Sequence, residues 1–164
     1  MGRSERALGL VLACRKELPL LLRAGRWDPD GKQRGSLLHG ARVLLAGTSD
    51  VDALARLLGP TGAHVVRPAA PDRPTRDEVA AADVLVLLPG AAPLAEDVLA
   101  ALPAGASLVD IAAPNAVDVD ALAAGLAAGT PLHAALVLGP GGLGPEHPLW
   151  RSPRALLVPE EDVA

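Results

Sequence analysis

Aromatic residues are almost absent from this sequence. It contains no Phe and no Tyr, and its two tryptophans are Trp27 and Trp150, although half of its 164 residues are hydrophobic. A chain of this length forms one domain, which buries about 70% of the surface of the unfolded chain. The core must therefore consist of aliphatic side chains, chiefly Leu, Val and Ala.

Cysteine is scarce as well, and its scarcity limits the chemistry. The single Cys14 excludes an internal disulfide bond and a CxxC metal site. It lies in a Leu-rich helical segment, where a cysteine is typical of a small buried hydrophobic residue. No histidine has metal-ligand spacing with a partner, so we expect no metal site.

Long apolar runs and dense clusters of one charge are also missing. The apolar segment from Ala7 to Ala13 is far shorter than the about 20 residues that span a bilayer, and it lacks a signal-peptide cleavage site. The net charge is −4, and no Lys/Arg cluster is dense enough to follow a phosphate backbone. We therefore expect a cytoplasmic protein that binds neither membranes nor nucleic acid.

The sequence does contain a regular alternation of short apolar runs and Ala/Leu-rich helical segments. The runs are apolar throughout, as strands covered on both faces should be, and comprise Arg42–Ala46, Ala63–Arg67, Asp83–Leu88, Ala106–Ile111, Leu132–Leu138 and Ala155–Val158. The predicted helices between them are Val51–Leu58, Thr75–Ala81, Ala95–Ala101 and Asp118–Ala127. This rhythm predicts an α/β fold with a parallel sheet and helices on both faces.

A further helix is predicted before the first strand, from Ser4 to about Ala24, with Pro19 marking a kink or a second start. We expect residues 1–164 to form a single domain. Within it, residues 4–27 hold the N-terminal helix and residues 42–158 the βαβ core.

These segments together resemble the nucleotide-binding domain of the D-isomer-specific 2-hydroxyacid dehydrogenases. The similarity lies in SERALGLVLACRKELPLLLRAGRW, LHGARVLLAGTSDVDALARLLGPTGAHVV, ADVLVLLPGAAPLAEDVLAALPAGASLVDIA, VDVDALAAGLAAGTPLHAALVL and GPEHPLWRSPRALLVPE, which follow the family's order. The resemblance implies a Rossmann-like, doubly wound sheet with an N-terminal interdomain and dimer helix. The family's substrate domain has no counterpart in the sequence, so we expect a stand-alone domain.

The family's dimer helix also suggests a partner. The helix carries more apolar residues than one buried stripe needs, namely Leu8, Leu10, Val11, Leu12, Leu18, Leu20, Leu21 and Leu22. Because the surplus would otherwise form an exposed apolar patch, we expect a homodimer held by this helix.

The family's cofactor signature, G-x-G-x-x-G, is degenerate here. The segment from Gly47 to Asp52 reads GTSDVD, so that only the first glycine is present. A Cβ at Ser49 crowds a phosphate, and a carboxylate about 5 Å from one costs about 3 kcal/mol at an effective dielectric of 20. The carboxylates are those of Asp50 and Asp52, and Ser49-x-x-Asp52 resembles a capping box that satisfies the helix amides internally.

The alternative is weak dinucleotide binding at the same loop, through Gly47, Ser49, Asp50 and Val51. Arg67, at the end of the second predicted strand, would face a 2′-phosphate, which favours NADP over NAD. A lone Arg at a strand end is more often simply solvated. The expected cofactor is therefore none, or weakly bound NAD(P).

The resemblance further implies a catalytic Arg, Glu and His, and all three are missing. The Arg of the family's NTARG motif corresponds to Ala113, and glycines fill the loop that should carry the Glu. The His that follows the last strand corresponds to Glu160. Hydride transfer to a 2-keto acid by the family's mechanism is therefore not expected.

Acidic residues are the groups that could still act in the crevice. Asp50, Asp110, Glu160 and Glu161 should lie near the carboxyl ends of strands, where neighbouring carboxylates can raise one another's pKa and yield a general acid. Asp110 is the first candidate because it ends an apolar strand. The alternative for Asp110 is a structural role, bonding to nearby loop amides.

Three functional hypotheses follow. The first is a pseudo-dehydrogenase, a non-redox binding or assembly module. The second is a repurposed biosynthetic enzyme, of cyclase or isomerase type, that uses crevice carboxylates on a small organic ligand. The third is an NAD(P)-dependent oxidoreductase. The missing catalytic residues and the acidic loop favour the first two, and fold alone does not separate these.

Overall fold

Six parallel strands form the centre of the computed structural model, which describes residues 2–15, 38–130 and 133–160. The strands are β1 (Arg42–Ala46), β2 (His64–Val66), β3 (Val84–Leu87), β4 (Ser107–Asp110), β5 (His133–Leu138) and β6 (Ala155–Pro159). Their order in the sheet is β2-β1-β3-β4-β5-β6, and every neighbouring pair is parallel. The apolar runs therefore predicted the strands correctly, to about one residue at each end.

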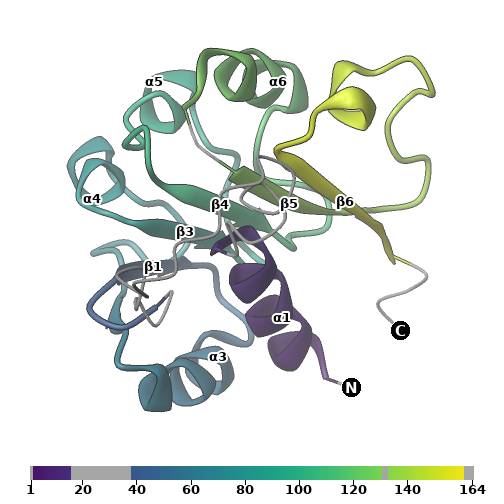
Figure 1. Cartoon of the computed structure of the whole chain (residues 1–164). Helices are drawn as coiled ribbons and strands as arrows, with labels where there is room; N and C mark the ends of the chain where they lie inside the picture. Colours follow the sequence, from purple (N-terminus) through teal and green to yellow (C-terminus); the bar gives the residue numbers. More distant parts are fainter. Residues whose placement is uncertain (1, 16–37, 131–132, 161–164) are drawn as a thin grey trace, which may run out of the picture.

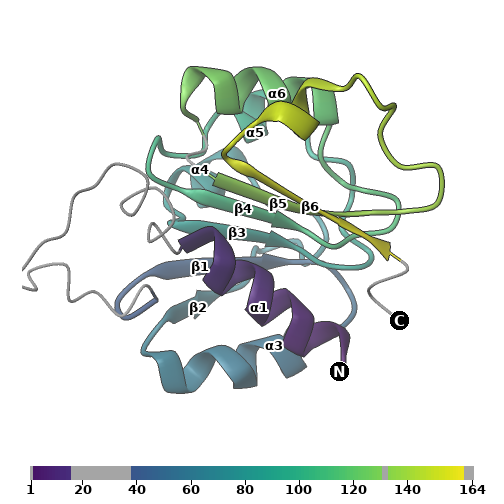
Figure 2. The same cartoon turned by 45° about the vertical axis from the view of Figure 1, so that its right-hand side comes forward.

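Helices cover both faces of the sheet, so the predicted doubly wound architecture is confirmed (Figures 1 and 2). One face carries α1 (Arg3–Arg15) and α3 (Val51–Leu58), and the other carries α4 (Arg76–Ala80), α5 (Glu96–Leu99) and α6 (Val119–Ala128). Short 3-10 turns, η1 (Gly59–Thr61) and η2 (Pro148–Arg151), lie in the connections. Successive strand residues point to opposite faces, which is why the apolar runs are continuous and feed two separate aliphatic cores.

The helix α1 lies on the sheet of its own chain. Its residues Ala7, Leu10 and Val11 are buried in the core on the α1 and α3 face, with Leu8 and Leu12 packed against that core. Part of the apolar surplus from which we inferred a dimer is thus used within the chain. The predicted continuation of this helix to Ala24, with its remaining leucines, lies outside the described residues.

Side chains cap the N-termini of α4 and α6, but no side chain caps α3, where the sequence predicted a capping box. Thr75 and Glu78 form a capping box at α4, each accepting the backbone N–H of the other, and Asp118 caps α6. The capping box predicted at Ser49 and Asp52 is wrong. The residue before α3 is Asp50, in the left-handed region at φ 64°, and no side chain caps this helix.

The strand order places the crevice where parallel sheets bind their ligands. The chain runs from β1 outward to β2 and then back past β1 to β3, so the connections diverge between β1 and β3. Ligands of open α/β sheets bind at the carboxyl ends of the strands at such a point. In the dinucleotide-binding order two strands lie outside the first one, whereas in the described sheet only β2 does.

Candidate functional site

The loop that corresponds to the family's cofactor signature is filled by carbonyl oxygens of the protein itself. The amide nitrogen of Gly47 donates to Pro71 O at 2.7 Å, while those of Thr48 and Ser49 donate to Pro89 O at 3.0 and 3.1 Å. In a dinucleotide site the backbone N–H groups of this turn approach the pyrophosphate. In this chain the amides of Gly47, Thr48 and Ser49 are already paired, so a phosphate bound to these three groups would have to displace two peptide carbonyls.

The two carbonyls belong to loops that are joined to each other above the end of β1. Ala92 N donates to Asp72 O at 2.9 Å, which connects the loop after β3 to the loop after β2. Glu78 holds the start of the latter loop, because its carboxylate accepts Ala69 N at 2.8 Å as well as Thr75 N at 2.7 Å. These backbone hydrogen bonds lower the pKa of Glu78. The loop after β2 is therefore held by Glu78, and the loop after β3 is held to it by the hydrogen bond between Ala92 and Asp72.

The one glycine that remains of the signature has a packing role. A Cβ at Gly47 would lie 2.7 Å from the Cβ of Leu88 and 2.9 Å from its carbonyl oxygen, and φ is +148°. Both contacts are too short for any residue with a side chain. The close approach of β1 to the end of β3 therefore requires glycine at this position, whether or not a nucleotide binds.

The acidic residues of this loop are paired with arginines. Asp50 lies 3.5 Å from the guanidinium of Arg3, and Asp52 pairs with Arg67. Arg67 is thus engaged by a carboxylate rather than set aside for a 2′-phosphate. The side chain of Asp52 is 80% exposed, so water and Arg67 weaken the repulsion that the sequence suggested. The occupied amides are the stronger obstacle to a phosphate.

A cavity of about 440 Å³ opens beside this loop at the carboxyl ends of β3 to β6. It is lined by Arg3, Pro89, Ile111, Ala113, Val137, Gly139 and Glu160. The structure thus brings together Ala113 and Glu160, which correspond to the family's Arg and His, although they are far apart in the sequence. Figure 2 shows why Arg3 joins them: α1 begins on the side to which the β6 arrow points.

Asp110 lies next to this cavity but is turned away from solvent. It is fully buried, and its Oδ1 accepts Ala112 N at 2.9 Å while its Oδ2 accepts Ala116 N and Val117 N at 2.8 and 3.0 Å. Burial raises the pKa of Asp110 to about 6, against the opposing effect of these amide hydrogen bonds. The geometry is that of the structural alternative, in which Asp110 shapes the loop that carries Ala113.

Of the four acidic candidates, three have a described position at this edge of the sheet. Glu160 lines the cavity, and Asp50 contacts the cavity residue Arg3. Asp110 is buried directly before the lining residue Ile111. Glu161 lies outside the described residues. Sequence reasoning missed Arg3 and the carbonyls of Pro71 and Pro89. Every residue has a backbone carbonyl, so residue identity does not show which carbonyls fill the turn. The hydrophobic periodicity of α1 likewise does not predict where its first residues lie relative to the sheet.

His147 has a structural role in the loop that precedes η2. His147 accepts Leu149 N at 3.2 Å and contacts Asp120 at 3.0 Å, so it orders the loop before η2.

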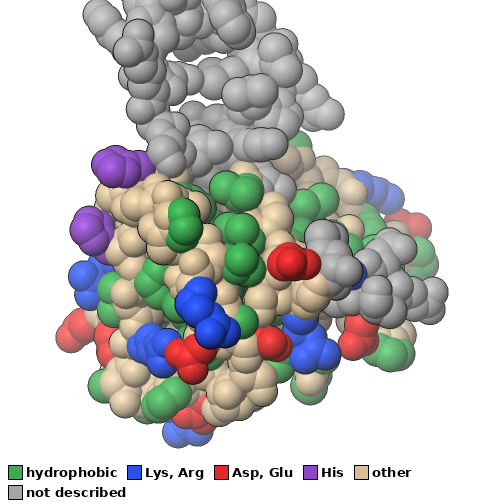
Figure 3. All heavy atoms as spheres, turned by 90° about the horizontal axis from the view of Figure 1, so that it is seen from below, with side chains coloured by type: hydrophobic (Ala, Val, Ile, Leu, Met, Phe, Trp, Pro, Cys, Tyr) green, Lys and Arg blue, Asp and Glu red, His purple; other side chains and the backbone are tan. Residues whose placement is uncertain are grey.

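Among the described residues, no group of three or more His, Cys, Asp and Glu could hold a metal ion. On the face seen in Figure 3, arginine and acidic side chains lie next to one another rather than in separate patches. No helix within the described ranges is long and apolar enough to cross a bilayer.

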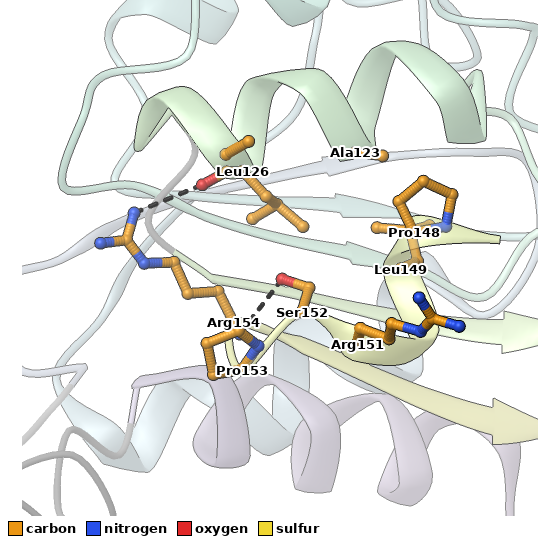
Figure 4. Close-up of a pocket in the computed structure, with 9 residues that line it drawn as sticks. Ala123, Leu126, Pro148, Leu149, Arg151, Ser152, Pro153 and Arg154 are labelled. Carbon is orange, nitrogen blue, oxygen red and sulfur yellow. Dashed lines mark hydrogen bonds between the residues drawn. The ribbon is translucent and has the colours of Figure 1, made fainter. Parts of the chain in front are cut away.

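A second cavity, of about 350 Å³, lies between α6 and η2 (Figure 4). Its polar groups are already used within the chain: Arg154 donates to Leu126 O at 3.4 Å, and Arg151 pairs with Glu146 at 2.9 Å. The cavity also lies away from the carboxyl ends of the strands. It is therefore a weaker candidate than the cavity beside Glu160.

Fold and crevice together define a Rossmann-type α/β domain, and comparison with known proteins agrees. The chain matches a D-lactate dehydrogenase from Sporolactobacillus sp with a TM-score of 0.74 and 25% identity, over 96% of this chain and 57% of that one. It matches a phosphoglycerate oxidoreductase from Rhizobium etli with a TM-score of 0.74 and 23% identity, over 95% of this chain and 57% of that one. For the NAD-complexed D-isomer specific 2-hydroxyacid dehydrogenase from Lactobacillus delbrueckii ssp. bulgaricus, the TM-score is 0.72 and the identity 18%, over 95% and 58%.

The chain therefore spans little more than half the length of these three structures. No protein-family model matches it, and no curated protein does. The resemblance to D-isomer-specific 2-hydroxyacid dehydrogenases is thus confirmed at the level of the fold.

Proposed function

We propose that the chain is a dehydrogenase-like binding or assembly module that performs no hydride transfer. The observation that carries the proposal is the occupation of the amides of Gly47, Thr48 and Ser49 by the carbonyls of Pro71 and Pro89. A dinucleotide gains much of its affinity at this turn. These three amides can contribute to binding only after the loops that carry Pro71 and Pro89 have moved.

The residues at the neighbouring cavity support the same conclusion. Ala113 has no group that could bind a carboxylate, and Glu160 adds a negative charge where a substrate acid would have to lie. Neither residue performs the task of the Arg or the His that the resemblance implies at its position. The cavity nevertheless has a volume of about 440 Å³, which is within the range of small-molecule sites. Binding without redox chemistry is the function that fits both features.

Calorimetric titration with NADH and with NADPH tests the proposal. We expect dissociation constants weaker than about 100 μM, or about 5.5 kcal/mol of binding free energy. A variant that combines Glu78→Ala with Asp50→Gly and Asp52→Gly should bind more tightly, because it releases the loop after β2 and removes both carboxylates. The matched control is Glu146→Gln, which changes an exposed carboxylate that does not line the cavity. A low-micromolar constant for the wild-type protein with either dinucleotide would overturn the proposal.

A second candidate function is a repurposed, non-redox enzyme that uses crevice carboxylates on a small organic molecule. The observation in its favour is that the carboxylate of Glu160 lines a cavity with apolar walls, which is a setting for acid–base chemistry. Asp110 is less suited, because its oxygens accept three loop amides. Loss of an identified turnover in Glu160→Gln, with the fold unchanged, would establish this candidate over the first.

A further inference from the structure

We propose that the cavity beside Glu160 binds a small organic amine, whose ammonium group pairs with the Glu160 carboxylate while its hydrocarbon part packs on Ile111 and Val137. The inference rests on the proposed function in one respect: the cavity adjoins the crevice, and in a protein that binds dinucleotides weakly it is open to another ligand. The proposal names a ligand class for a site at which the family's acid-binding Arg position holds Ala113.

The charged side chains around the cavity determine which sign of ligand charge it favours. Arg3 is the one cation among the lining residues, and its guanidinium lies 3.5 Å from the Asp50 carboxylate, which offsets its charge. Apart from Arg3, no cationic side chain lines the cavity with Glu160 in the described part of the chain. Asp110 beneath the wall adds further negative charge whenever it is ionised. The described groups at this edge therefore favour a cation and oppose an anion.

The position of the Glu160 carboxylate determines where the ammonium group of the ligand would bind. Its Oε2 lies 3.5 Å from the point that a Cβ on Gly139 would occupy, so the carboxylate rests over the end of β5. The absence of a side chain at Gly139 leaves that oxygen accessible from the cavity. Carboxylates that pair with ammonium groups form short, charge-assisted hydrogen bonds, so one partly buried carboxylate suffices to orient a small amine.

The apolar residues that line the cavity determine what the uncharged part of the ligand can be. Ile111 and Val137 point to the same face of the sheet and are both largely buried, with Pro89 closing one side. These groups offer no hydrogen bond to a polar ligand body. A branched hydrocarbon chain on a single amine satisfies both the apolar walls and the carboxylate, whereas a highly hydroxylated or anionic ligand would satisfy neither.

Three probes of matched shape test the assignment, each titrated into the nitrogen-15-labelled protein and followed by NMR: 3-methylbutylamine, 4-methylpentanoate and leucine. We expect saturable shifts of the Ala113 and Gly139 amides with the amine, at a dissociation constant of about 1 mM or tighter. The carboxylate should bind at least about tenfold more weakly, a difference of about 1.4 kcal/mol.

Two substitutions and a control connect binding to the charges. Glu160→Gln should weaken amine binding about tenfold. Arg3→Gln should leave it equal or tighter, because the cation is removed and Asp50 is released. Glu146→Gln, a change of the same kind at an exposed residue that does not line the cavity, should leave it unaltered. Amide shifts and thermal unfolding of each variant show whether its fold is intact.

Four outcomes would overturn the inference. These are tighter binding of the carboxylate than of the amine, wild-type affinity for the amine in Glu160→Gln, an absence of saturable shifts, and tighter binding of leucine than of the amine. The last would mean that Arg3 recruits a carboxylate. Failure of the proposed function is seen separately, as low-micromolar binding of NADH or NADPH without any amine present.

Discussion

The amide nitrogen of Gly47 and the carbonyl oxygen of Pro71 lie 2.7 Å apart, joining the end of β1 to the loop that follows β2. Gly47 stands where a dinucleotide-binding turn would begin, and Pro71 belongs to a connection between strands. This hydrogen bond and the two to Pro89 pair the first three amides of the turn within the chain, and Gly47 also has a packing role, because a Cβ there would meet Leu88. Its substitution should therefore affect folding in the absence of any ligand.

Gly47→Ala should lower the free energy of unfolding by about 2–4 kcal/mol, since a Cβ meets Leu88 at 2.7 Å and the backbone has φ +148°. Urea denaturation of the protein without added nucleotide measures the change. Gly105→Ala is the matched control, because a Cβ at Gly105 meets nothing within 4 Å, and we expect a change within about 0.5 kcal/mol. Equal stabilities of the two variants would contradict the packing role.

Asp50 occupies a backbone conformation that suits glycine better. At φ 64° it lies in the left-handed region, where a residue with a Cβ costs roughly 1–2 kcal/mol. Asp50→Gly and Asp50→Ala both remove the pairing with Arg3, so the difference between them isolates the backbone. We expect the Gly variant to be the more stable by about 1 kcal/mol in chemical denaturation. An Ala variant as stable as the Gly variant would refute the argument.

The buried carboxyl of Asp110 should make stability depend on pH with a definite sign. Its pKa is raised from 3.8 to about 6 in the folded chain, so its contribution is fully present below pH 4 and is lost as pH rises to about 6. The free energy of unfolding, measured relative to Asp110→Asn, should fall by on the order of 2–3 kcal/mol between pH 4 and 7.

The Asn variant serves as the reference because it has no titratable group at this position. Its amide nitrogen would also face the backbone N–H groups of Ala116 and Val117, so we expect it to be the less stable protein at pH 4 by about 2–4 kcal/mol. A gap between the two proteins that stays constant or widens with pH would show that Asp110 does not titrate as described. Glu78, whose pKa is lowered, contributes with the opposite sign in both proteins and cancels.

The predictability of the fold and that of the site differ for physical reasons. The strands were predictable because runs such as Val84–Leu87 are covered on both faces and must be apolar throughout. The start of α3 was not, because the sequence suggested that Ser49 and Asp52 cap the helix, whereas Asp50 adopts φ 64° and no side chain caps it. Tertiary contacts with Arg3 and Arg67 hold the two aspartates instead.

The site could be predicted only where residue identity carries the chemistry. Ala113 and Glu160 stand where the resemblance implies a catalytic Arg and His, which can be read from the sequence, and the structure places both on one cavity. The occupied turn is not visible, because the atoms that fill it are peptide carbonyls whose placement depends on two loops. Arg3 reaches the cavity because α1 crosses the sheet, and that arrangement is set by packing of residues far apart in the sequence.

Combinations of a 2-keto acid with NADH or NADPH should give no turnover above background. Without the Arg, a substrate carboxylate loses a charge-assisted pair of about 1.5–3 kcal/mol. Without the His, the forming alkoxide loses its proton donor, which costs roughly 10²–10⁴ in rate. Pyruvate, glyoxylate, phenylpyruvate and hydroxypyruvate, followed at the absorbance of the reduced cofactor, form the panel. Saturable oxidation that disappears in Glu160→Gln would reveal a dehydrogenase with a carboxylic acid as its proton donor.

A homodimer remains our prediction for the assembly of the chain. In the described part of α1, Ala7, Leu10 and Val11 are used by the chain's own core, so the prediction now depends on the sequence from Leu18 to Leu22. Light scattering at micromolar concentration should give twice the chain mass of 16.6 kDa. Replacing Leu20 and Leu21 with Asp should shift the mass toward a monomer. A monomeric wild-type protein would exclude a dimer through this segment at that concentration.

In the described sheet one strand, β2, lies outside β1, and the loop that follows β2 acts as a tethered competitor for the turn. The segment after Arg67 folds back to the end of β1, where Pro71 O accepts the amide of Gly47. A group held on a short tether acts at an effective concentration in the millimolar range. An external phosphate group must exceed that competition at the turn before it gains any net affinity there. Binding of a dinucleotide phosphate at Gly47 would therefore require this loop to open.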